Sequence, residues 1–303
     1  MTEILVTYII TIYNKSRYLP DVIEAIYNQE GDFLREYIFI DDGSTDNSSE
    51  IINKYYNKNS LYIKQPNSGP AIAINKGINL AKGKYIQIVD GDDLLHKDST
   101  ISLLKEIQNA GVVFGGLDKY NVGEPFAPNP PKDYKTIYIK DPLGKVVEGK
   151  IKGICSIGAT KSLIRADLLK QIQGADERVF TQDFSISLRL ACLTDFIFID
   201  RKVASTPTGF ASDHLSSNKA REAHDTLLTL LYFMEDHDDF NKTLFARRKN
   251  KVICKYVRKF FSQEHLNYLV QKCVPYLGSR EELIEEYREA LSKYFKEGVK
   301  VVN

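Results

Sequence analysis

Short runs of strand-favouring residues alternate with helix-like stretches over the first 90 residues. The strand-like runs are only a few residues long, and the stretches between them carry apolar positions at helical spacing. This alternation predicts a mostly parallel sheet with helices on both faces, which is an α/β fold of the Rossmann-like type. The predicted elements are a strand at 5–12, a helix at 18–28, a strand at 37–40, a helix at 44–56, a strand at 61–64, a helix at 70–80 and a strand at 85–89.

The pattern changes in the second half of the chain. A passage rich in Pro and Gly at 123–144 is long for a simple connection and predicts a functional loop. From about residue 218 onwards strand alternation disappears and only helical spacing remains. We therefore expect a main domain at 1–217 and a helical extension at 218–303. Further predicted elements are a strand at 112–117, helices at 162–173 and 183–192, and a strand at 196–199.

Polar residues follow three of the predicted strands directly. Asn14 follows the first strand, Asp41 and Asp42 follow the second, and Asp90 follows the fourth. In open α/β sheets, ligands bind beyond the carboxyl ends of the strands. The sequence therefore predicts one functional edge where these three clusters meet.

Three carboxylates crowd into four residues at the end of the fourth strand: Asp90, Asp92 and Asp93, with Gly91 allowing a tight turn. Such carboxylates repel one another unless a cation neutralises them. Carboxylates together with substrate phosphates are the usual ligands of Mg²⁺ or Mn²⁺ at diphosphate substrates. The alternative interpretation is a solvated acidic turn. The position directly after a buried strand favours the metal site over this alternative.

The second acidic turn also has two interpretations. Asp41 and Asp42 can accept hydrogen bonds from a base N–H and from ribose hydroxyls. Ser44 or Asp46 is expected to cap the helix that follows, since Ser and Asp are favoured N-cap residues. Capping explains those two residues, but it does not explain the pair at 41 and 42.

Composition and charge exclude several classes of protein. The formal net charge of +1 gives no overall electrostatic attraction for nucleic acid. The four cysteines, which form no CxxC pair, indicate neither a zinc site nor a disulfide framework. The start of the chain has no signal peptide pattern, and no run of about 18 apolar residues would span a bilayer. We expect a cytoplasmic protein.

The helical tail contains one strongly basic stretch, 246–261, with seven basic residues, no acidic ones and interleaved apolar positions. A basic amphipathic helix can lie on an anionic membrane surface, which would place the protein peripherally at the inner face of the membrane. Alternatively, the helix packs on the domain or on a second subunit and leaves its charges in solvent.

These motifs, taken in order, closely resemble those of family 2 glycosyltransferases. The match begins with Thr11-Ile12-Tyr13-Asn14 and continues through Asp41-Asp42-Gly43-Ser44. It extends through Asp90-Gly91-Asp92-Asp93 to a late segment at 181–190, and it covers roughly residues 4–217. Its remaining blocks are Asn67-Ser68-Gly69, Ala73, Asn75, Gly77, Ala81 to Ile86, and Gly174-Ala175-Asp176-Glu177.

The resemblance implies a GT-A fold, a nucleotide-sugar donor that is commonly a UDP-sugar, and inversion at the anomeric carbon. It implies a glycan or glycolipid acceptor, as in synthesis of a bacterial surface polysaccharide. Asp183 would be the general base that takes the proton of the acceptor hydroxyl. The other implied roles are nucleotide binding for Thr11, Tyr13, Asp41, Asp42, Asn67, Gly69 and Asp90, binding of Mn²⁺ or Mg²⁺ for Asp92 and His214, and acceptor or supporting contacts for Asp93, Gln182 and Arg189.

One position departs from the family pattern. Gln182 stands where the family usually has Glu, directly before Asp183. Because an amide can still hydrogen-bond an acceptor hydroxyl, we predict altered specificity and retained activity. A binding or scaffolding protein that keeps the fold without turnover is the alternative. A sugar-nucleotide pyrophosphorylase and a dinucleotide oxidoreductase both need a Gly-rich loop after a strand, and the sequence has none.

Overall fold

The computed structural model describes residues 4–107, 110–126, 128, 133–149, 154, 157–208, 219–257 and 276–295. The chain forms two compact units. Unit 1 consists of Met1–Pro142 and Ile151–Phe210, and unit 2 consists of Leu143–Lys150 and Ala211–Asn303. The boundary predicted at residue 217 falls in a stretch outside the described residues.

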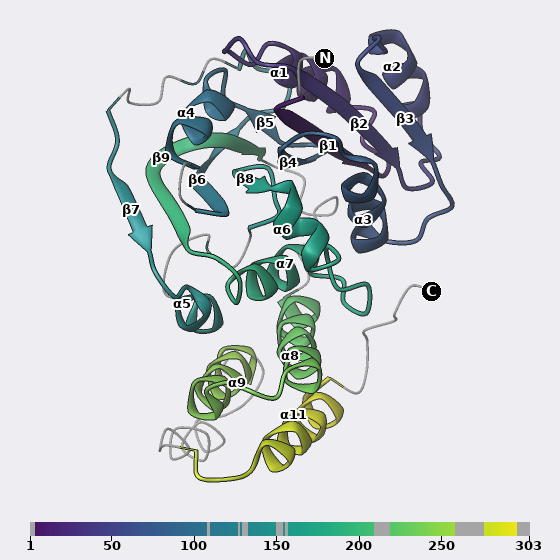
Figure 1. Cartoon of the computed structure of the whole chain (residues 1–303). Helices are drawn as coiled ribbons and strands as arrows, with labels where there is room; N and C mark the ends of the chain where they lie inside the picture. Colours follow the sequence, from purple (N-terminus) through teal and green to yellow (C-terminus); the bar gives the residue numbers. More distant parts are fainter. Residues whose placement is uncertain are drawn as a thin grey trace. The chain divides into compact units, whose positions relative to one another are not determined.

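Unit 1 is built on one mixed sheet (Figure 1). The strand order is β3-β2-β1-β4-β8-β6-β9-β5, and β7 pairs with β9. Strands β3, β2, β1 and β4 are parallel neighbours, whereas β8 runs antiparallel to both β4 and β6. The strands are β1 (Val6–Ile12), β2 (Arg35–Asp41), β3 (Ser60–Lys64), β4 (Tyr85–Asp90), β5 (Leu94–Leu95), β6 (Val112–Tyr120), β7 (Thr136–Ile139), β8 (Ser162–Arg165) and β9 (Phe196–Pro207).

The helices of unit 1 cover the sheet because its central strand is apolar on both faces. Tyr8 and Ile10 of β1 belong to the same buried cluster as the apolar side chains of α1. Ile9 points the other way, and a Cβ on Gly77 of α3 would come within 2.4 Å of it, so α3 lies very close to the strand. The helices are α1 (Leu19–Tyr27), α2 (Ser48–Tyr55), α3 (Pro70–Leu80), α4 (Ser99–Glu106), α6 (Ala166–Gln171) and α7 (Gln182–Leu190).

The predicted alternation over the first 90 residues is confirmed, with element ends within a few residues of those expected. The helix predicted at 162–173 is wrong in its first four residues. Ser162–Arg165 form strand β8, because Leu163 and Ile164 are buried between β4 and β6 and tertiary pairing overrides the helical pattern. The passage at 123–144 contains a strand, β7, and the start of a helix, α5 (Leu143–Glu148). The sequence pattern also missed β5 and α4.

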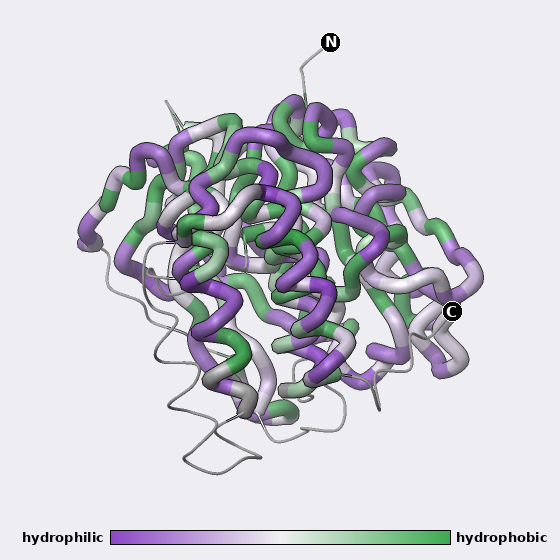
Figure 2. The backbone as a smooth tube through the Cα atoms, turned by 90° about the horizontal axis from the view of Figure 1, so that it is seen from below, coloured by the Kyte–Doolittle hydropathy of each residue, from purple (hydrophilic) through white to green (hydrophobic). Residues whose placement is uncertain are grey.

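In unit 2, α8 (Lys219–Asp236), α9 (Lys242–Val257) and α11 (Arg280–Tyr294) pack against one another, and α5 packs on α9 (Figure 1). Phe233, Phe245 and Tyr287 form the centre of this packing, and Ser279 begins α11 with a capping box. Figure 2 shows hydrophilic and hydrophobic segments following one another along the helices, as expected where each helix buries one face.

The basic stretch predicted at 246–261 is described as far as residue 257, as part of α9. Its apolar side chains Val252 and Ile253 are buried. Lys249 forms an ion pair with Glu286 of α11, while Arg248 and Lys251 donate to the main-chain oxygen of Glu148. In the described residues, this stretch therefore packs within unit 2 against α5 and α11.

Across the part of the chain that the structure describes, no helix has the length and apolarity needed to cross a bilayer.

Candidate active site

The carboxyl ends of β1, β2 and β4 meet at one edge of the sheet. In the parallel register, Thr11 lies beside Ile40 on one side and beside Asp90 on the other, and Ile12 lies beside Asp41. The main-chain N–H groups of Asp42 and Gly91 donate to the oxygens of Ile12 and Thr11, which extends the pairing past the strand ends. The predicted convergence of the three polar clusters is therefore confirmed.

Asp41 is fully buried and holds the turn that follows β2. Its carboxylate accepts hydrogen bonds from the main-chain N–H of Ser44 at 2.7 Å and from the hydroxyls of Ser49 and Tyr62 at 3.0 Å. Burial alone would raise the pKa of Asp41, but these hydrogen bonds outweigh it and keep that pKa below its ordinary value. Asp41 therefore stabilises the turn that follows β2 at this edge of the sheet.

We predict that Asp41→Ala lowers the free energy of unfolding by about 1–3 kcal/mol at pH 7, since it leaves buried donors without an acceptor. Because the folded-state pKa is lowered, the stabilisation is complete above the unfolded value and is lost as the pH falls through the folded value. Urea unfolding of both proteins should therefore give curves that converge from about pH 5 downwards. A constant difference across this range would contradict the role, and Asp32→Ala, at an exposed carboxylate, is the control.

Asp42 holds the loop after β3. One of its oxygens accepts from the main-chain N–H of Ser68 and from the amide of Gln65, and the other accepts from the N–H of Gly69. Gly43 has φ +82°, and a Cβ there would lie 2.7 Å from the main-chain nitrogen of Asn67. The loop that carries Asn67 and Gly69 is consequently fastened to the end of β2.

The residues after β1 combine an exposed aromatic ring with a fixed turn. Tyr13 is 47% exposed at this edge of the sheet, although it directly follows a buried strand. Asn14 adopts φ +53°, donates its N–H to Ser44 and accepts from the N–H of Thr45. The expectation that Ser44 or Asp46 caps α2 is wrong, because the N-cap residue is Asn47 and its side chain makes no capping bond. Asp46 lies one residue before the N-cap and accepts from the N–H of Ser48, the first residue of α2.

The acidic turn after β4 lies over Thr160. The hydroxyl of Thr160 donates to the carboxylate of Asp93 at 2.7 Å and accepts from the N–H of Asp90 at 3.1 Å. The ammonium of Lys15 lies 2.5 Å from the Asp92 carboxylate, and the Tyr120 hydroxyl donates to the main-chain oxygen of Asp92. Asp92 and Asp93 are both buried.

Negative charge accumulates at this turn. Burial and the carboxylates of Asp92 and Asp183 raise the pKa of Asp90 to about 7, and Lys15 opposes the shift. Burial and the neighbouring Asp90 and Asp92 raise the pKa of Asp93 well above its ordinary value. The negative charge of Asp183 contributes to the raised pKa of Asp90, as a neighbouring carboxylate does.

Asp183 reaches the edge from the first turn of α7. Its carboxylate accepts from the N–H of Phe184 at 2.8 Å, and it is half-buried. The loop before α7 is held by Asn75 of α3, whose amide bonds both main-chain groups of Ala175 and the carboxylate of Glu177. Gly174 is required in this loop, because at φ +72° a Cβ would lie 2.1 Å from Asn75 Oδ1.

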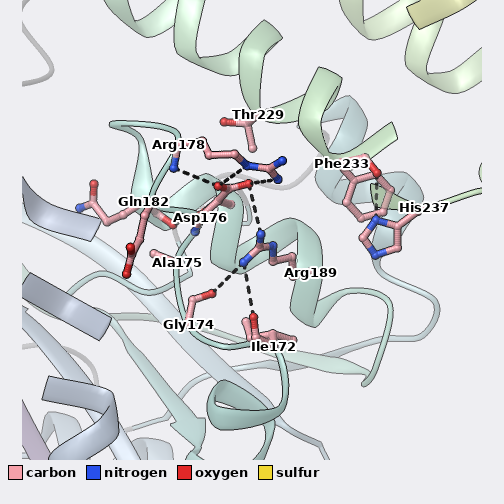
Figure 3. Close-up of polar contacts among 12 residues, drawn as sticks. Ile172, Gly174, Ala175, Asp176, Arg178, Gln182, Arg189, Thr229, Phe233 and His237 are labelled. Carbon is pink, nitrogen blue, oxygen red and sulfur yellow. Dashed lines mark hydrogen bonds and ion pairs between the residues drawn. The ribbon is translucent and has the colours of Figure 1, made fainter. Parts of the chain in front are cut away.

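Arg189 belongs to the support of this loop. Its guanidinium lies 3.2 Å from the carboxylate of Asp176 and donates to the main-chain oxygens of Ile172 and Gly174. Arg178 binds the same carboxylate at 2.7 Å (Figure 3). Although burial alone would raise the pKa of Asp176, hydrogen bonds from Arg178 and the charge of Arg189 lower it. Figure 3 shows the side chain of Gln182 pointing away from this cluster.

The structure describes one of the two expected metal ligands. Asp92 lies at the functional edge, and His214 falls outside the described residues. Among the residues that the structure describes, no three His, Cys, Asp or Glu side chains are grouped so as to hold a metal ion.

The structure adds residues that sequence reasoning had missed. Lys15 and Thr160 contact the acidic turn directly, and Tyr120 supports it. Thr160 and Tyr120 are far from the turn in sequence and carry no motif, so only the strand order brings them there. Lys15 directly follows Asn14 at the functional edge, and that position was the available signal.

The comparisons with known proteins agree on one family. Residues 7–172 match the model of Glycosyl transferase family 2. The glycosyltransferase GlyG of Streptococcus pneumoniae is 37% identical over 122 residues, which are 39% of this chain and 40% of that protein. A poly(ribitol-phosphate) beta-glucosyltransferase of Bacillus spizizenii is 26% identical over 273 residues, which are 78% of this chain and 41% of that protein. The chain thus spans about two fifths of the length of these relatives.

Solved structures share the fold. S. aureus TarS 1–349 in complex with UDP-GlcNAc has a TM-score of 0.61 at 16% identity, covering 97% of this chain and 92% of that one. The mannosyltransferase PcManGT of Pyrobaculum calidifontis, in complex with GDP-Man and Mn²⁺, has a TM-score of 0.56 at 15% identity, covering 95% and 85%. The mixed sheet with flanking helices is a GT-A fold. Because the family model matches more than half of the sequence, the chain belongs to glycosyl transferase family 2.

Proposed function

We propose that this protein is an inverting glycosyltransferase that moves a sugar from a nucleoside diphosphate donor, a UDP-sugar, to an acceptor hydroxyl with the help of a divalent cation. The observation that carries the proposal is the meeting of two acidic elements at one sheet edge. Asp90 ends β4, Asp92 and Asp93 follow it, and the charge of Asp183 at the start of α7 contributes to the raised pKa of Asp90. Such a site can hold a phosphate-bound cation and also supply a base.

The donor would lie along the ends of β1, β2 and β4. Tyr13 offers an exposed ring on which a base can stack. Thr11, Asp41, Asp42, Asn67 and Gly69 would form the rest of the nucleotide site, with the fully buried Asp41 acting through the turn after β2. Asp90, at the end of the neighbouring strand, would contact the ribose. In support of a nucleotide-sugar donor, the TarS and PcManGT structures of the same fold contain UDP-GlcNAc and GDP-Man.

The cation, Mn²⁺ or Mg²⁺, would be held by Asp92 and by His214, with the diphosphate oxygens completing its coordination. When bound, it neutralises the negative charge that develops on the departing diphosphate. The crowding of the three carboxylates is consistent with this role, since Asp92 raises the pKa of Asp90, and Asp90 and Asp92 raise the pKa of Asp93. The PcManGT structure, which contains Mn²⁺, supports the choice of metal.

Asp183 would act as general base. A bond forms between the acceptor oxygen and the anomeric carbon while the bond from that carbon to the diphosphate breaks, and the acceptor proton passes to the Asp183 carboxylate. Attack from the face opposite the diphosphate inverts the anomeric centre. Asn75 and the Asp176–arginine cluster position α7, and with it Asp183, because they fasten the loop before it.

The acceptor side is expected to involve Asp93 and Gln182, with Arg189 in support of the loop at 172–176. We infer a glycan or glycolipid acceptor in surface-polymer synthesis, which the match to a poly(ribitol-phosphate) beta-glucosyltransferase over 78% of the chain supports. In this proposal residues 1–217 form the catalytic domain and 218–303 a helical extension. The protein would work at the cytoplasmic side of the membrane.

A panel of nucleotide sugars tests the proposal. Each donor is incubated with the protein and Mn²⁺, and release of nucleoside diphosphate is measured, since slow donor hydrolysis needs no acceptor. Release from one donor, abolished by a chelator, is the expected result. Donor binding by calorimetry without any release, even with glycan and glycolipid acceptors added, would favour a non-catalytic binding protein.

A further inference from the structure

Lys15 lies inside the acidic cluster. Its ammonium is 2.5 Å from the carboxylate of Asp92, and only 16% of its side chain is exposed. Its charge also acts on the two neighbouring carboxylates, Asp90 and Asp93. Lys15 therefore already occupies the position of a counter-ion for the carboxylate proposed to hold the metal.

The position of Lys15 is built into the fold. Its main-chain oxygen accepts from the N–H groups of Tyr18 and Leu19, where α1 begins, and its own N–H donates to the hydroxyl of Ser48. A Cβ on Gly91 would lie 3.2 Å from the Cγ of Lys15, so the turn after β4 passes directly over the lysine stem. The ammonium lies 5.5 Å from the centre of the Tyr18 ring.

We propose that Lys15 is an internal cation that competes with the divalent metal for Asp92 and gives it up when a diphosphate arrives. This inference rests on the proposed function, because it takes Asp92 as the metal-holding carboxylate. A dication and an ammonium cannot both lie against the same carboxylate without strong repulsion. A diphosphate removes the conflict, since its oxygens coordinate the metal and also accept from the ammonium on its flexible stem.

Two consequences follow for binding. The protein without nucleotide should bind the metal weakly, because the metal must displace Lys15. Nucleotide and metal should each strengthen the binding of the other by the same factor, as linkage requires. The lysine thus makes metal and donor bind together and discourages occupation of the site by metal alone.

The test is a calorimetric titration of nucleotide-free protein with Mn²⁺. Lys15→Met should bind Mn²⁺ roughly tenfold or more tightly than wild type, within the range of about 5- to 150-fold that is typical of coupled sites. Lys15→Arg, which keeps the charge, should bind as weakly as wild type. Lys97→Met is the matched control, since it removes a lysine from an exposed ion pair with Glu30. Circular dichroism verifies that each variant is folded.

Equal Mn²⁺ affinities of wild type and a folded Lys15→Met would overturn the competition. The gain in Mn²⁺ affinity should vanish in the double variant Lys15→Met with Asp92→Asn. If the gain persists there, the metal binds elsewhere and the inference is also overturned. Repeating the titrations in the presence of UDP, and in parallel with GDP, distinguishes failure of the lysine competition from failure of the proposed function. If wild type binds Mn²⁺ with nucleotide and Lys15→Met shows no gain, only the inference fails; if no protein binds Mn²⁺ with either nucleotide, both fail.

Discussion

Asp183→Asn should reduce sugar transfer by roughly 10²–10⁴-fold, the range expected for loss of a general base. The amide has nearly the same size as the carboxylate and can still accept the N–H of Phe184, so α7 should keep its position. Donor and metal binding should change little, because they are assigned to the ends of β1, β2 and β4. Initial rates with a saturating acceptor measure the first expectation, and calorimetry with the nucleotide measures the second.

A matched control variant distinguishes the catalytic effect of Asp183→Asn from the effect of removing a carboxylate at the start of a helix. Asp167 occupies the first turn of α6, and Asp167→Asn makes the same chemical change at a helix N-terminus. Loss of a carboxylate there is expected to cost only about 0.3–1 kcal/mol of stability. Retention of full transfer activity by Asp183→Asn would rule out Asp183 as the base, and equal losses in both variants would indicate a purely structural effect.

Asp92→Ala should lower metal-dependent donor turnover by about 10²-fold or more, because a metal supplies several kcal/mol of charge stabilisation and each ~1.4 kcal/mol is a factor of ten. Unlike Asp183→Asn, this variant should also lose Mn²⁺ binding in the presence of nucleotide. Nucleoside diphosphate release and Mn²⁺ titration are measured on the same preparation. Asp200→Ala, at an exposed carboxylate of β9, is the control.

Turnover by Asp92→Ala that still depends on Mn²⁺ would move the metal to another residue. Turnover that no longer responds to Mn²⁺, yet stays at the wild-type rate, would show that the metal is dispensable. The two variants should change Mn²⁺ affinity in opposite directions. Asp92→Ala removes the carboxylate and should weaken metal binding, whereas Lys15→Met removes the competing ammonium and should strengthen it.

The edge of the site could be predicted from the sequence because its geometry follows from local rules. Polar residues at or just beyond the carboxyl ends of neighbouring parallel strands meet at one edge, so the placement of Asn14, Asp41 and Asp90 needed only the strand pattern. Asp183 at the start of a helix was also expected, and α7 begins one residue before it.

What the sequence did not reveal depends on contacts between distant segments. Thr160 contacts the acidic turn because β8 pairs with β4, and the residues of β8 look helical in isolation. Asn75 fastens a loop that lies 100 residues further along the chain. The pairing of Lys15 with Asp92 spans 77 residues and follows from the close approach of Gly91 to the lysine stem. No local pattern encodes such pairings.

The most direct test of the central claim follows the anomeric proton by NMR while the protein consumes its donor with Mn²⁺ present. Even without an acceptor, the sugar released to water carries the stereochemistry of the reaction before it equilibrates. The account predicts that the anomer opposite to that of the donor appears first, and that both donor loss and this signal disappear in Asp92→Ala. First appearance of the same anomer as in the donor, or no donor consumption with any nucleotide sugar or acceptor, would contradict an inverting glycosyltransferase.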